Sequence, residues 1–375
     1  MVHSHVGAFR VYVNQLSLPW SKPWRRNFCE LGAGLCAQRT LVVRCLARGL
    51  TGPNKTMRSV DKRLRRFLGN ERLDETALDA ALAGHLRFLL ARLPRHPQIP
   101  VMVDWTKVGE HDLLWLQIPC RGRSLPLIGF VVSGRGEEDE EAWRTLSEKE
   151  LLLRLRRCWP ADAPPPLLLM DRGFDKGPLL EWLLAEGWLF VLRAKENLFF
   201  DAQGQVLNGV LCGLPGRPLL FPQVTYTQAH RFRVHLVVAA QRHPRTRKNV
   251  RWLLVTTLPE QELRRAPGLY TLRMSPEETH RDVKSGAHHG GLALSHLGRL
   301  RLDRLERLVF LLSLVYSFLV LVGHTELEIH AWLKQKRWGL SIATLGRELL
   351  LHAGPLASRL ARHACARIRL DPAWN

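Results

Sequence analysis

The sequence has few cysteines and lacks the usual marks of export or membrane insertion. Its seven cysteines are scattered, and none are spaced as Cys-x-x-Cys, so neither a zinc ribbon nor a disulfide framework is indicated. The N-terminus lacks the positive-then-apolar layout of a signal peptide. The longest apolar run, residues 308–322, is shorter than the roughly 20 residues that a membrane span needs. We therefore expect a cytoplasmic protein with reduced thiols and a core helix at that run.

Acidic residues are also scarce. The chain has 34 Asp or Glu against 55 Lys or Arg, a formal net charge of +21 over 375 residues. Residues 1–95 alone hold 17 basic and 6 acidic residues. Such an excess indicates a polyanionic partner, with nucleic acid the first candidate and an anionic membrane surface the second. The alternative is a chain whose general composition is basic.

The first 95 residues have a helical pattern. Apolar positions at helical spacing predict helices over 39–50, 62–67 and 74–93, with Asp74 well placed to begin the third. Three prolines in 94–100 predict a linker. The 46% hydrophobic composition suffices for one large core or for two or three smaller ones.

Short apolar runs separated by helical segments begin at residue 101. They predict five strands, of which the first three form a meander, at 101–105, 113–120, 125–133, 167–170 and 188–194. Helices are predicted beside them at 141–158 and 176–186. This order predicts an α/β fold with a mixed five-stranded sheet and flanking helices.

Residues 197–266 have a different character, with glycines, prolines and alternating segments such as 230–239 and 250–256. We expect a mainly β insertion there. Helical patterns return at 275–285 and 302–322. The expected division is an N-terminal helical DNA-binding domain, a core in two parts, the insertion and a C-terminal helical tail, at 1–95, 100–196 with 267–324, 197–266 and 325–375.

Two aspartates directly follow apolar strands. Asp104 ends the run VMVD, and Asp171 ends LLLMD. A buried carboxylate is costly unless it is paired or binds a cation. Two such carboxylates in one domain indicate a site for a hard cation such as Mg²⁺. The alternative is that each aspartate caps the turn or helix after it.

A third acidic residue lies in the segment YTLRMSPEETHRDVK. Glu277 and Lys284 are seven residues apart, so they share one helix face with Arg281 between them. A stripe with one acid and two bases can present a carboxylate to a metal and basic groups to phosphates. We expect Ser275 to cap this helix and Glu278 to complete a capping box. The alternative is a solvated face with Glu277 paired to Arg281. The spacing is Y-x2-R-x3-E-x6-K, formed by Tyr270, Arg273, Glu277 and Lys284.

Together these motifs resemble the DDE transposases of bacterial insertion sequences, specifically the IS4-like group. That family has a DWT-like first aspartate, a DRGF-like second aspartate and the Y-R-E-K spacing, which correspond here to Asp104, Asp171 and the segment around Glu277. The resemblance covers about residues 100 to 325. One departure is His280, where the family commonly has Phe, and it bears on helix packing.

The resemblance implies a ribonuclease-H-like core in which the three acidic residues hold two Mg²⁺ ions, with Mn²⁺ able to substitute. One ion would activate water or a DNA 3′-hydroxyl for in-line attack on phosphorus, and the other would stabilise the leaving oxygen. Tyr270, Arg273 and Lys284 would contact phosphates at the transposon end, which suits the guanidinium and ammonium groups. The resemblance also implies a homodimer that holds two ends.

Further DNA contacts are expected outside these motifs. A basic helical stretch could dock on the terminal inverted repeat, or it could be a charged, solvated face. Trp252 or Tyr226 in the insertion could stack on a flipped base near the cleaved end, or both could belong to the core. The basic stretch comprises Arg58, Lys62, Arg63, Arg65 and Arg66.

The leading functional hypothesis is cut-and-paste DNA transposition, with hydrolysis at the element ends and strand transfer by the 3′-hydroxyl into target DNA. A second hypothesis is a nuclease of the same fold that does not join DNA. A third is a non-catalytic, sequence-specific DNA-binding protein such as a domesticated transposase, which would be expected to have lost an acidic residue or the helix motif, and neither is lost here. A peripheral membrane protein fits least, because the apolar helix has no basic face.

Overall fold

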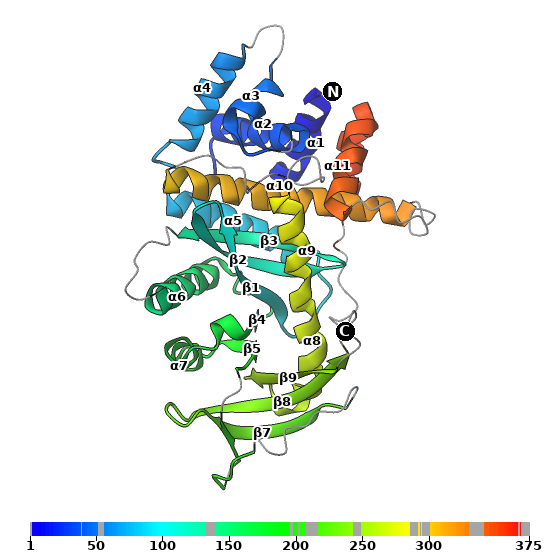
Figure 1. Ribbon diagram of the computed structural model, residues 1–375. Helices are drawn as coiled ribbons and strands as arrows, with labels where there is room; N and C mark the ends of the chain where they lie inside the picture. The colour runs from blue at the N-terminus through cyan, green and yellow to red at the C-terminus, as the bar shows by residue number, and fades with distance from the viewer. Residues whose placement is uncertain are drawn as a thin grey trace.

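The structure is a computed structural model with a helical region and an α/β region (Figure 1). The long helix α10 (Leu302–Ile329) lies between these two regions. The structure describes residues 2–38, 40–51, 56–132, 140–195, 198–201, 203–207, 217–242, 249–285, 292, 294, 301–329, 341–366 and 368.

Five helices lie within residues 2–38, 40–51 and 56–90, the described part of the first 90 residues. Two begin at side-chain caps, because Thr56 accepts from the Ser59 N–H at 3.2 Å and Asp74 accepts from the Ala77 N–H at 2.9 Å. The helix predicted to begin at Asp74 is thereby confirmed. The helix predicted over 39–50 is shorter, because Val42 has extended backbone angles. The five are α1 (Val2–Gln15), α2 (Lys22–Gln38), α3 (Val43–Arg48), α4 (Met57–Leu68) and α5 (Glu75–Leu90).

The predicted three-stranded meander is confirmed. Strands β1 (Ile99–Val108), β2 (His111–Cys120) and β3 (Arg123–Val132) pair antiparallel in sequence order. Two-residue loops join them, and Gly109 (φ 60°) and Gly122 (φ 70°) adopt the left-handed conformations that such tight turns require. The other two predicted strands, parallel to β1, are β4 (Pro166–Met170) and β5 (Leu189–Arg193).

The prediction of a five-stranded sheet is wrong in its count. Among the described residues the sheet has nine strands, in the order β3-β2-β1-β4-β5-β9-β8-β7-β6. The β-rich zone continues the same sheet, because β9 pairs antiparallel with β5 through Val191 and Thr256. This pairing covers the open edge that β5 would otherwise expose. The added strands are β6 (Phe199–Phe200), β7 (Leu219–Tyr226), β8 (Phe232–Arg242) and β9 (Asn249–Thr256).

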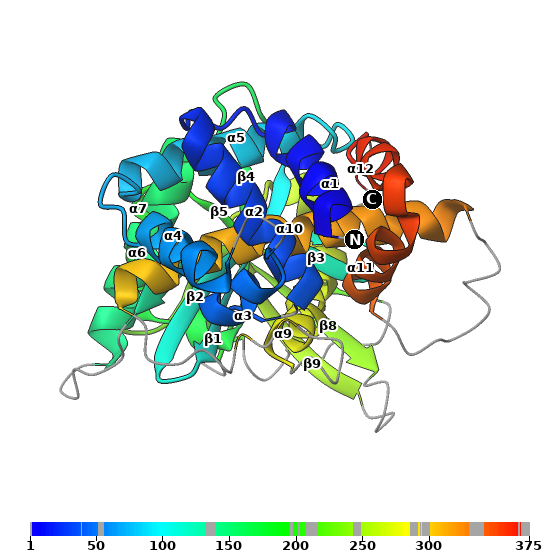
Figure 2. The same ribbon diagram turned by 90° about the horizontal axis from the view of Figure 1, so that it is seen from above.

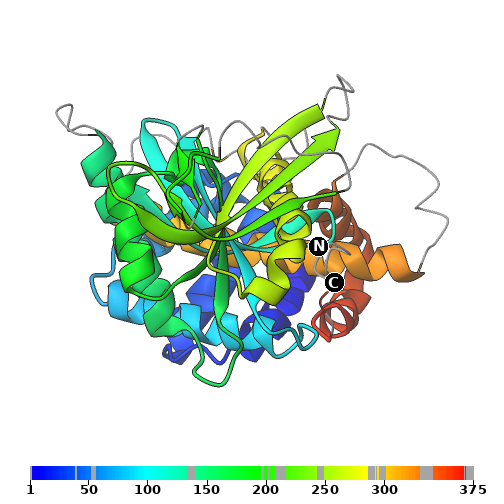
Figure 3. The same ribbon diagram turned by 90° about the horizontal axis from the view of Figure 1, so that it is seen from below.

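Helices lie on both sides of the sheet. In Figure 1, α6 (Glu140–Cys158) and α7 (Gly177–Ala185) lie to its left, and α8 (Ala266–Thr271) and α9 (Ser275–Lys284) lie to its right. Figure 3 shows the molecule from below, where the light-green strands β7, β8 and β9 run across the end that lies opposite the N-terminal helices. The sheet therefore connects the two groups of helices, and α9 packs directly against β1, β2 and β3.

Helix α10 is the central core element. By length and composition its segment Leu302–Thr325 could cross a membrane, but 89% of its apolar window is buried inside the protein. The expected core helix is thereby confirmed, although it is longer than the apolar run suggested. Figure 2 shows α10 passing beneath α1 and α2, with α11 (Ile342–Ala353) and α12 (Ala357–Ala364) next to α1. Gly323 and Gly346 allow α10 and α11 to touch backbone to backbone.

Candidate active site

Two of the predicted acidic residues meet at one edge of the sheet. Strands β1 and β4 run parallel, and their last paired residues are Met102 and Leu169. Asp104 lies two residues beyond Met102, and Asp171 directly follows β4. Asp104 is not at the end of its strand as expected, because β1 continues to Val108 in its hairpin with β2. It lies instead just beyond the part of β1 that pairs with β4.

A single guanidinium joins all three predicted acids. Nη2 of Arg273 lies 3.0 Å from Asp104 Oδ1 and 2.8 Å from Asp171 Oδ2, and Nη1 lies 3.5 Å from Glu277 Oε1. The other oxygen of Asp171 accepts from the Gly173 N–H at 2.8 Å. Asp171 therefore caps the turn after β4, as the alternative interpretation held, and also takes part in the acidic cluster.

Three carboxylates share one guanidinium in this cluster. The pKa of Asp104 is raised to about 6, mainly by burial, and the charges of Asp171 and Glu277 raise it further while Arg273 lowers it. The Asp104 side chain is 10% exposed and that of Glu277 is 54% exposed. A site of this kind favours an additional cation, because each carboxylate makes the ionisation of the others more costly.

Helix α9 carries Glu277 but does not begin as predicted. Ser275 has helical backbone angles (φ −63°, ψ −36°), and no side-chain cap is formed at this end. The capping box is wrong because helical turns run without a break from Glu260 through α8 to α9, so no helix end exists at Ser275. Glu278 instead accepts from Arg281 at 2.9 Å, and Glu277 pairs with Arg273, so the expected alternative pairing of Glu277 with Arg281 is also absent from the described contacts.

Lys284 and Arg281 differ in their positions on α9. The pKa of Lys284 is lowered by burial, while the negative charge of Asp104 opposes that shift, which places Lys284 near the acidic cluster. The Arg281 side chain is 68% exposed and pairs with Glu278. Of these two bases, Lys284 is the more buried and the one whose pKa responds to Asp104.

His280 takes the place of the aromatic residue that the resemblance led us to expect. Its ring stacks on Trp115, with centroids 5.8 Å apart and an interplanar angle of 2°. Its Nε2 lies 3.1 Å from the Gln117 amide nitrogen, and its Nδ1 lies 3.6 Å from Asp104 Oδ2. Burial, followed by the charges of Lys284 and Arg273, lowers its pKa to about 4. His280 is therefore neutral near pH 7 and packs α9 against β2 as an aromatic side chain would.

A buried ion pair contacts the residue that follows Asp104, and the sequence did not reveal it. Lys176 Nζ lies 2.6 Å from Glu148 Oε2, and these side chains are 5% and 1% exposed. Glu148 also accepts from the Trp105 indole N–H at 2.8 Å. The pair thus connects α6, the residue after Asp104 and the segment after Asp171. The sequence signal was weak, because Glu148 is one of several charged residues in its helix.

The aromatic residues named from the sequence are buried. Tyr226 is 0% exposed, stacks on Phe199 and donates its hydroxyl to Asp175 at 2.6 Å. Trp252 is 7% exposed and contacts the Tyr270 ring edge-on at 4.9 Å. Both Trp252 and Tyr226 occupy the core, as the alternative held, and this packing opposes base stacking in the present arrangement.

The basic residues of α4 are only partly available to a ligand. Arg65 pairs with Asp61 at 2.9 Å, and Arg63 pairs with the buried Glu30. The remaining three expected DNA-binding residues of this helix are exposed, namely Arg58, Lys62 and Arg66.

The three acids are of the chemical kind that binds a hard divalent cation. Among the described residues, no three His, Cys, Asp or Glu side chains are grouped closely enough to hold a metal in this arrangement. The Arg273 guanidinium lies between the acids and supplies the positive charge. Three carboxylates directed at one cationic group nevertheless form the oxygen-rich donor set that Mg²⁺ prefers.

A known protein family matches this chain. A model of the transposase DDE domain matches residues 102–317, which is more than half of the chain and includes Asp104, Asp171 and Glu277. No curated protein matches the chain significantly. Such a domain implies DNA as the partner and an enzyme of the nuclease or transposase kind, and the family typically uses a divalent metal. The chain therefore belongs to the DDE transposase family.

Proposed function

We propose that this chain is the cut-and-paste transposase of an IS4-like insertion sequence. It would cleave phosphodiester bonds at both ends of its element and join the resulting 3′-hydroxyls to target DNA. The main support is the meeting of Asp104, Asp171 and Glu277, from segments far apart in sequence, around one guanidinium. A ribonuclease-H-like core formed by residues 100–196 and 267–324 accords with the strand order β3-β2-β1-β4-β5.

The three carboxylates would hold two Mg²⁺ ions, or Mn²⁺ in their place. The chemistry supplied by bound ions is activation of water or a 3′-hydroxyl and stabilisation of the leaving oxygen. Arg273 would leave the carboxylates and turn to a phosphate at the element end, because guanidinium groups bind both kinds of oxygen pair. His280, neutral and fixed between Gln117 and Asp104, would keep the Asp104 carboxylate oriented.

The remaining DNA contacts would come from both regions of the chain. Lys284 would meet a phosphate next to the cleaved bond, and the exposed Arg281 a phosphate farther along the end. Tyr270 is 4% exposed, and a contact with phosphate would require it to move from its place beside Trp252. We also propose a homodimer that pairs two ends in the cytoplasm, on the nucleoid. The exposed residues of α4 would bind the terminal inverted repeat, including Arg58, Lys62 and Arg66.

The test is a cleavage assay on the element's own end. Purified protein is incubated with Mg²⁺ and a labelled duplex that carries the inverted repeat, beside the Asp171→Ala variant. We expect nicking at the repeat boundary that depends on metal and is absent in the variant. Binding of the duplex without cleavage in either Mg²⁺ or Mn²⁺ would contradict the proposal and favour a non-catalytic DNA-binding protein.

A nuclease that does not join DNA is the second candidate, because strand transfer would use the same carboxylates. Adding a supercoiled target plasmid to the assay separates the two. A transposase gives labelled ends joined to the plasmid, whereas a nuclease gives cleaved ends only.

A further inference from the structure

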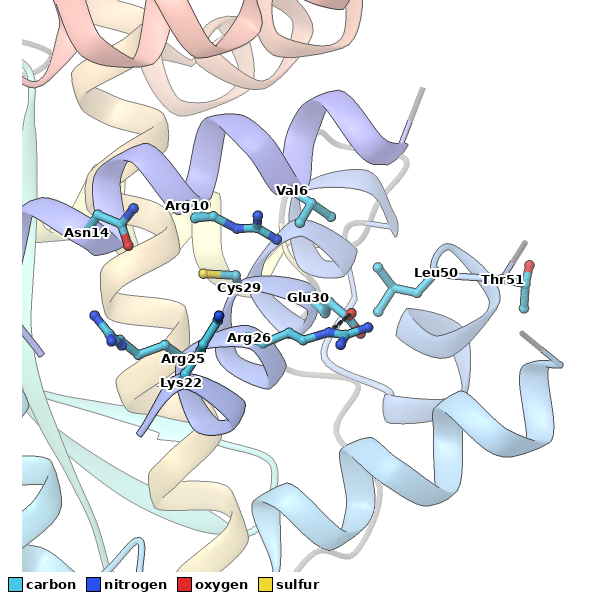
Figure 4. A pocket seen from close by; sticks show the side chains of 10 residues that line it. All are labelled: Val6, Arg10, Asn14, Lys22, Arg25, Arg26, Cys29, Glu30, Leu50 and Thr51. Atoms are coloured by element: carbon cyan, nitrogen blue, oxygen red, sulfur yellow. Dashed lines mark hydrogen bonds and ion pairs between the residues drawn. The ribbon is translucent and has the colours of Figure 1, made fainter. Parts of the chain in front are cut away.

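A second charged site lies in the helical region, far in sequence from the acidic cluster. A cavity of ≈ 560 Å³ opens between α1 and α2 and extends to Leu50 after α3. Figure 4 shows Arg10 reaching over Cys29 from α1, with Lys22 and Arg25 on the opposite side at the start of α2. Arg26 also lines this cavity. We call it the basic pocket.

The positive charge of the basic pocket is largely unbalanced. Among the described residues that line it, the one acid is Glu30, which is buried and is shared by Arg26 at 3.3 Å and by Arg63 of α4. Within the part of the chain that the structure describes, no ion pair is formed by Arg10, Lys22 or Arg25, and all three are exposed. Like charges that face one another without a partner repel, so an anion between them lowers the free energy.

The backbone and the thiol in the pocket do not offset this charge. Helix α2 begins at Lys22 and has no acidic residue in its first turn, so the positive end of its dipole adds to the side-chain charges. Cys29 lies beneath Arg10 and is 2% exposed. Burial raises the pKa of its thiol to about 11 even though Arg10 opposes the shift, so the thiol is neutral near pH 7.

The exposure of the cations indicates what kind of anion fits. A site for one small anion usually directs buried donors at a single point. Here the cations belong to two helices, are exposed and surround an opening, an arrangement suited to several phosphates on one strand. The same region also carries the exposed basic residues of α4, which would extend such a path.

We propose that the basic pocket binds the sugar–phosphate backbone of duplex DNA through Arg10, Lys22 and Arg25. The inference rests on the proposed function only in taking DNA as the partner. It assigns the principal phosphate contacts of the helical region to α1 and to the start of α2. The sequence had pointed to α4 alone.

The test measures duplex binding over a series of NaCl concentrations, with EDTA present so that no cleavage occurs. The double variant Arg10→Gln/Arg25→Gln removes two charges from the pocket. Arg87→Gln/Arg359→Gln removes two exposed charges elsewhere and serves as the matched control. We expect the first variant to bind about tenfold or more weakly near about 0.1 M salt, with a salt slope shallower by about one for each phosphate that is no longer neutralised. The control should bind as the wild type does.

Two results would overturn the proposal. One is a salt slope that is equal in the pocket variant and the control. The other is loss of the thermal stabilisation by sodium tripolyphosphate in the pocket variant while duplex binding is unchanged, which would assign the pocket to a free phosphate compound. If Arg10→Gln/Arg25→Gln does not fold, Lys22→Gln alone should still lower the slope by about one. The binding assay contains no metal, so its result does not depend on cleavage. If the chain binds DNA through the pocket but cleaves no DNA in the metal-containing assay, this inference is supported and the transposase proposal is contradicted.

Discussion

The acidic cluster and the basic pocket differ in how their charges are balanced. In the cluster, Asp104, Asp171 and Glu277 share the Arg273 guanidinium, and Asp104 is nearly buried. In the basic pocket, Arg10 and Arg25 are exposed and have no acidic partner among the described residues. A buried charge must have a partner in the free protein, whereas water and salt can screen an exposed one.

This difference separates two kinds of measurement. A change in the cluster or in its buried supports should alter the stability of the free protein as well as its chemistry. A change in the exposed basic residues should alter DNA binding and its salt dependence while stability stays constant. Variants that violate this division would show that the two regions are coupled.

The largest effect is expected from the acidic residues. Asp104→Ala, Asp171→Ala and Glu277→Ala should each reduce cleavage of the element end at least about a thousandfold, because each removes a proposed metal ligand. Duplex binding should stay within about threefold of the wild type, since the basic residues remain. Cleavage is measured with labelled duplex and binding by fluorescence anisotropy. Retained cleavage in any one variant would remove that residue from the site.

The buried pair behind the cluster should have the next largest effect. Lys176→Met leaves the Glu148 carboxylate buried without its cation, so the free energy of unfolding should fall by about 3 kcal/mol in urea titrations. The control is Arg156→Gln, which breaks an ion pair of equal length, 2.6 Å, whose side chains are about 40% exposed. That change should cost under about 1 kcal/mol. Equal losses in the two variants would mean that burial does not determine the strength of these pairs.

Replacing Arg273 should change both the stability of the free protein and its response to a divalent metal. Arg273→Ala leaves three carboxylates without their shared cation, and we expect a loss of about 2 kcal/mol, reduced from the fully buried case because Glu277 is half exposed. Mn²⁺ should then raise the melting temperature of the variant more than that of the wild type in the absence of DNA, because the guanidinium no longer competes.

The matched variant for this test is Arg273→Ala/Asp104→Asn, which has one carboxylate fewer and should lose the extra stabilisation by Mn²⁺. Equal gains in the wild type and in Arg273→Ala would show that the guanidinium does not compete with metal.

The sequence predicted the local elements well and their partners poorly. Asp104 and Asp171 drew attention because apolar runs leave few reasons for a carboxylate, although Asp104 lies within β1 and only Asp171 directly follows its strand. The pairing of β5 with β9 could not, since periodicity identifies a strand and not its neighbour. Likewise, the spacing placed Arg273 four residues before Glu277 but gave no sign of its contacts with Asp104 and Asp171, which depend on how α9 packs on the sheet.

The sequence also did not reveal which of the described basic residues are free of acidic partners. Charge density drew attention to α4, where basic residues are adjacent in sequence, yet Arg63 and Arg65 are bound to acids there. Arg10 and Lys22 belong to different helices and line one pocket only because α1 and α2 pack together. A contact between segments is a property of the tertiary structure, so composition alone could not reveal it.

The smallest effect on DNA binding is expected from replacing Lys284, a basic residue of the same helix as Glu277. Burial lowers the pKa of Lys284, while the negative charge of Asp104 opposes the shift. Lys284→Ala should weaken binding of the element end by up to about tenfold and make the salt slope shallower by about one, because one phosphate is no longer neutralised. Lys284→Arg, which keeps the charge, should retain the slope. The NaCl titration used for the basic pocket measures both variants. An unchanged slope in Lys284→Ala would mean that Lys284 contacts no phosphate and acts only on the carboxylates. Phosphate binding would then be confined to basic residues outside the acidic cluster.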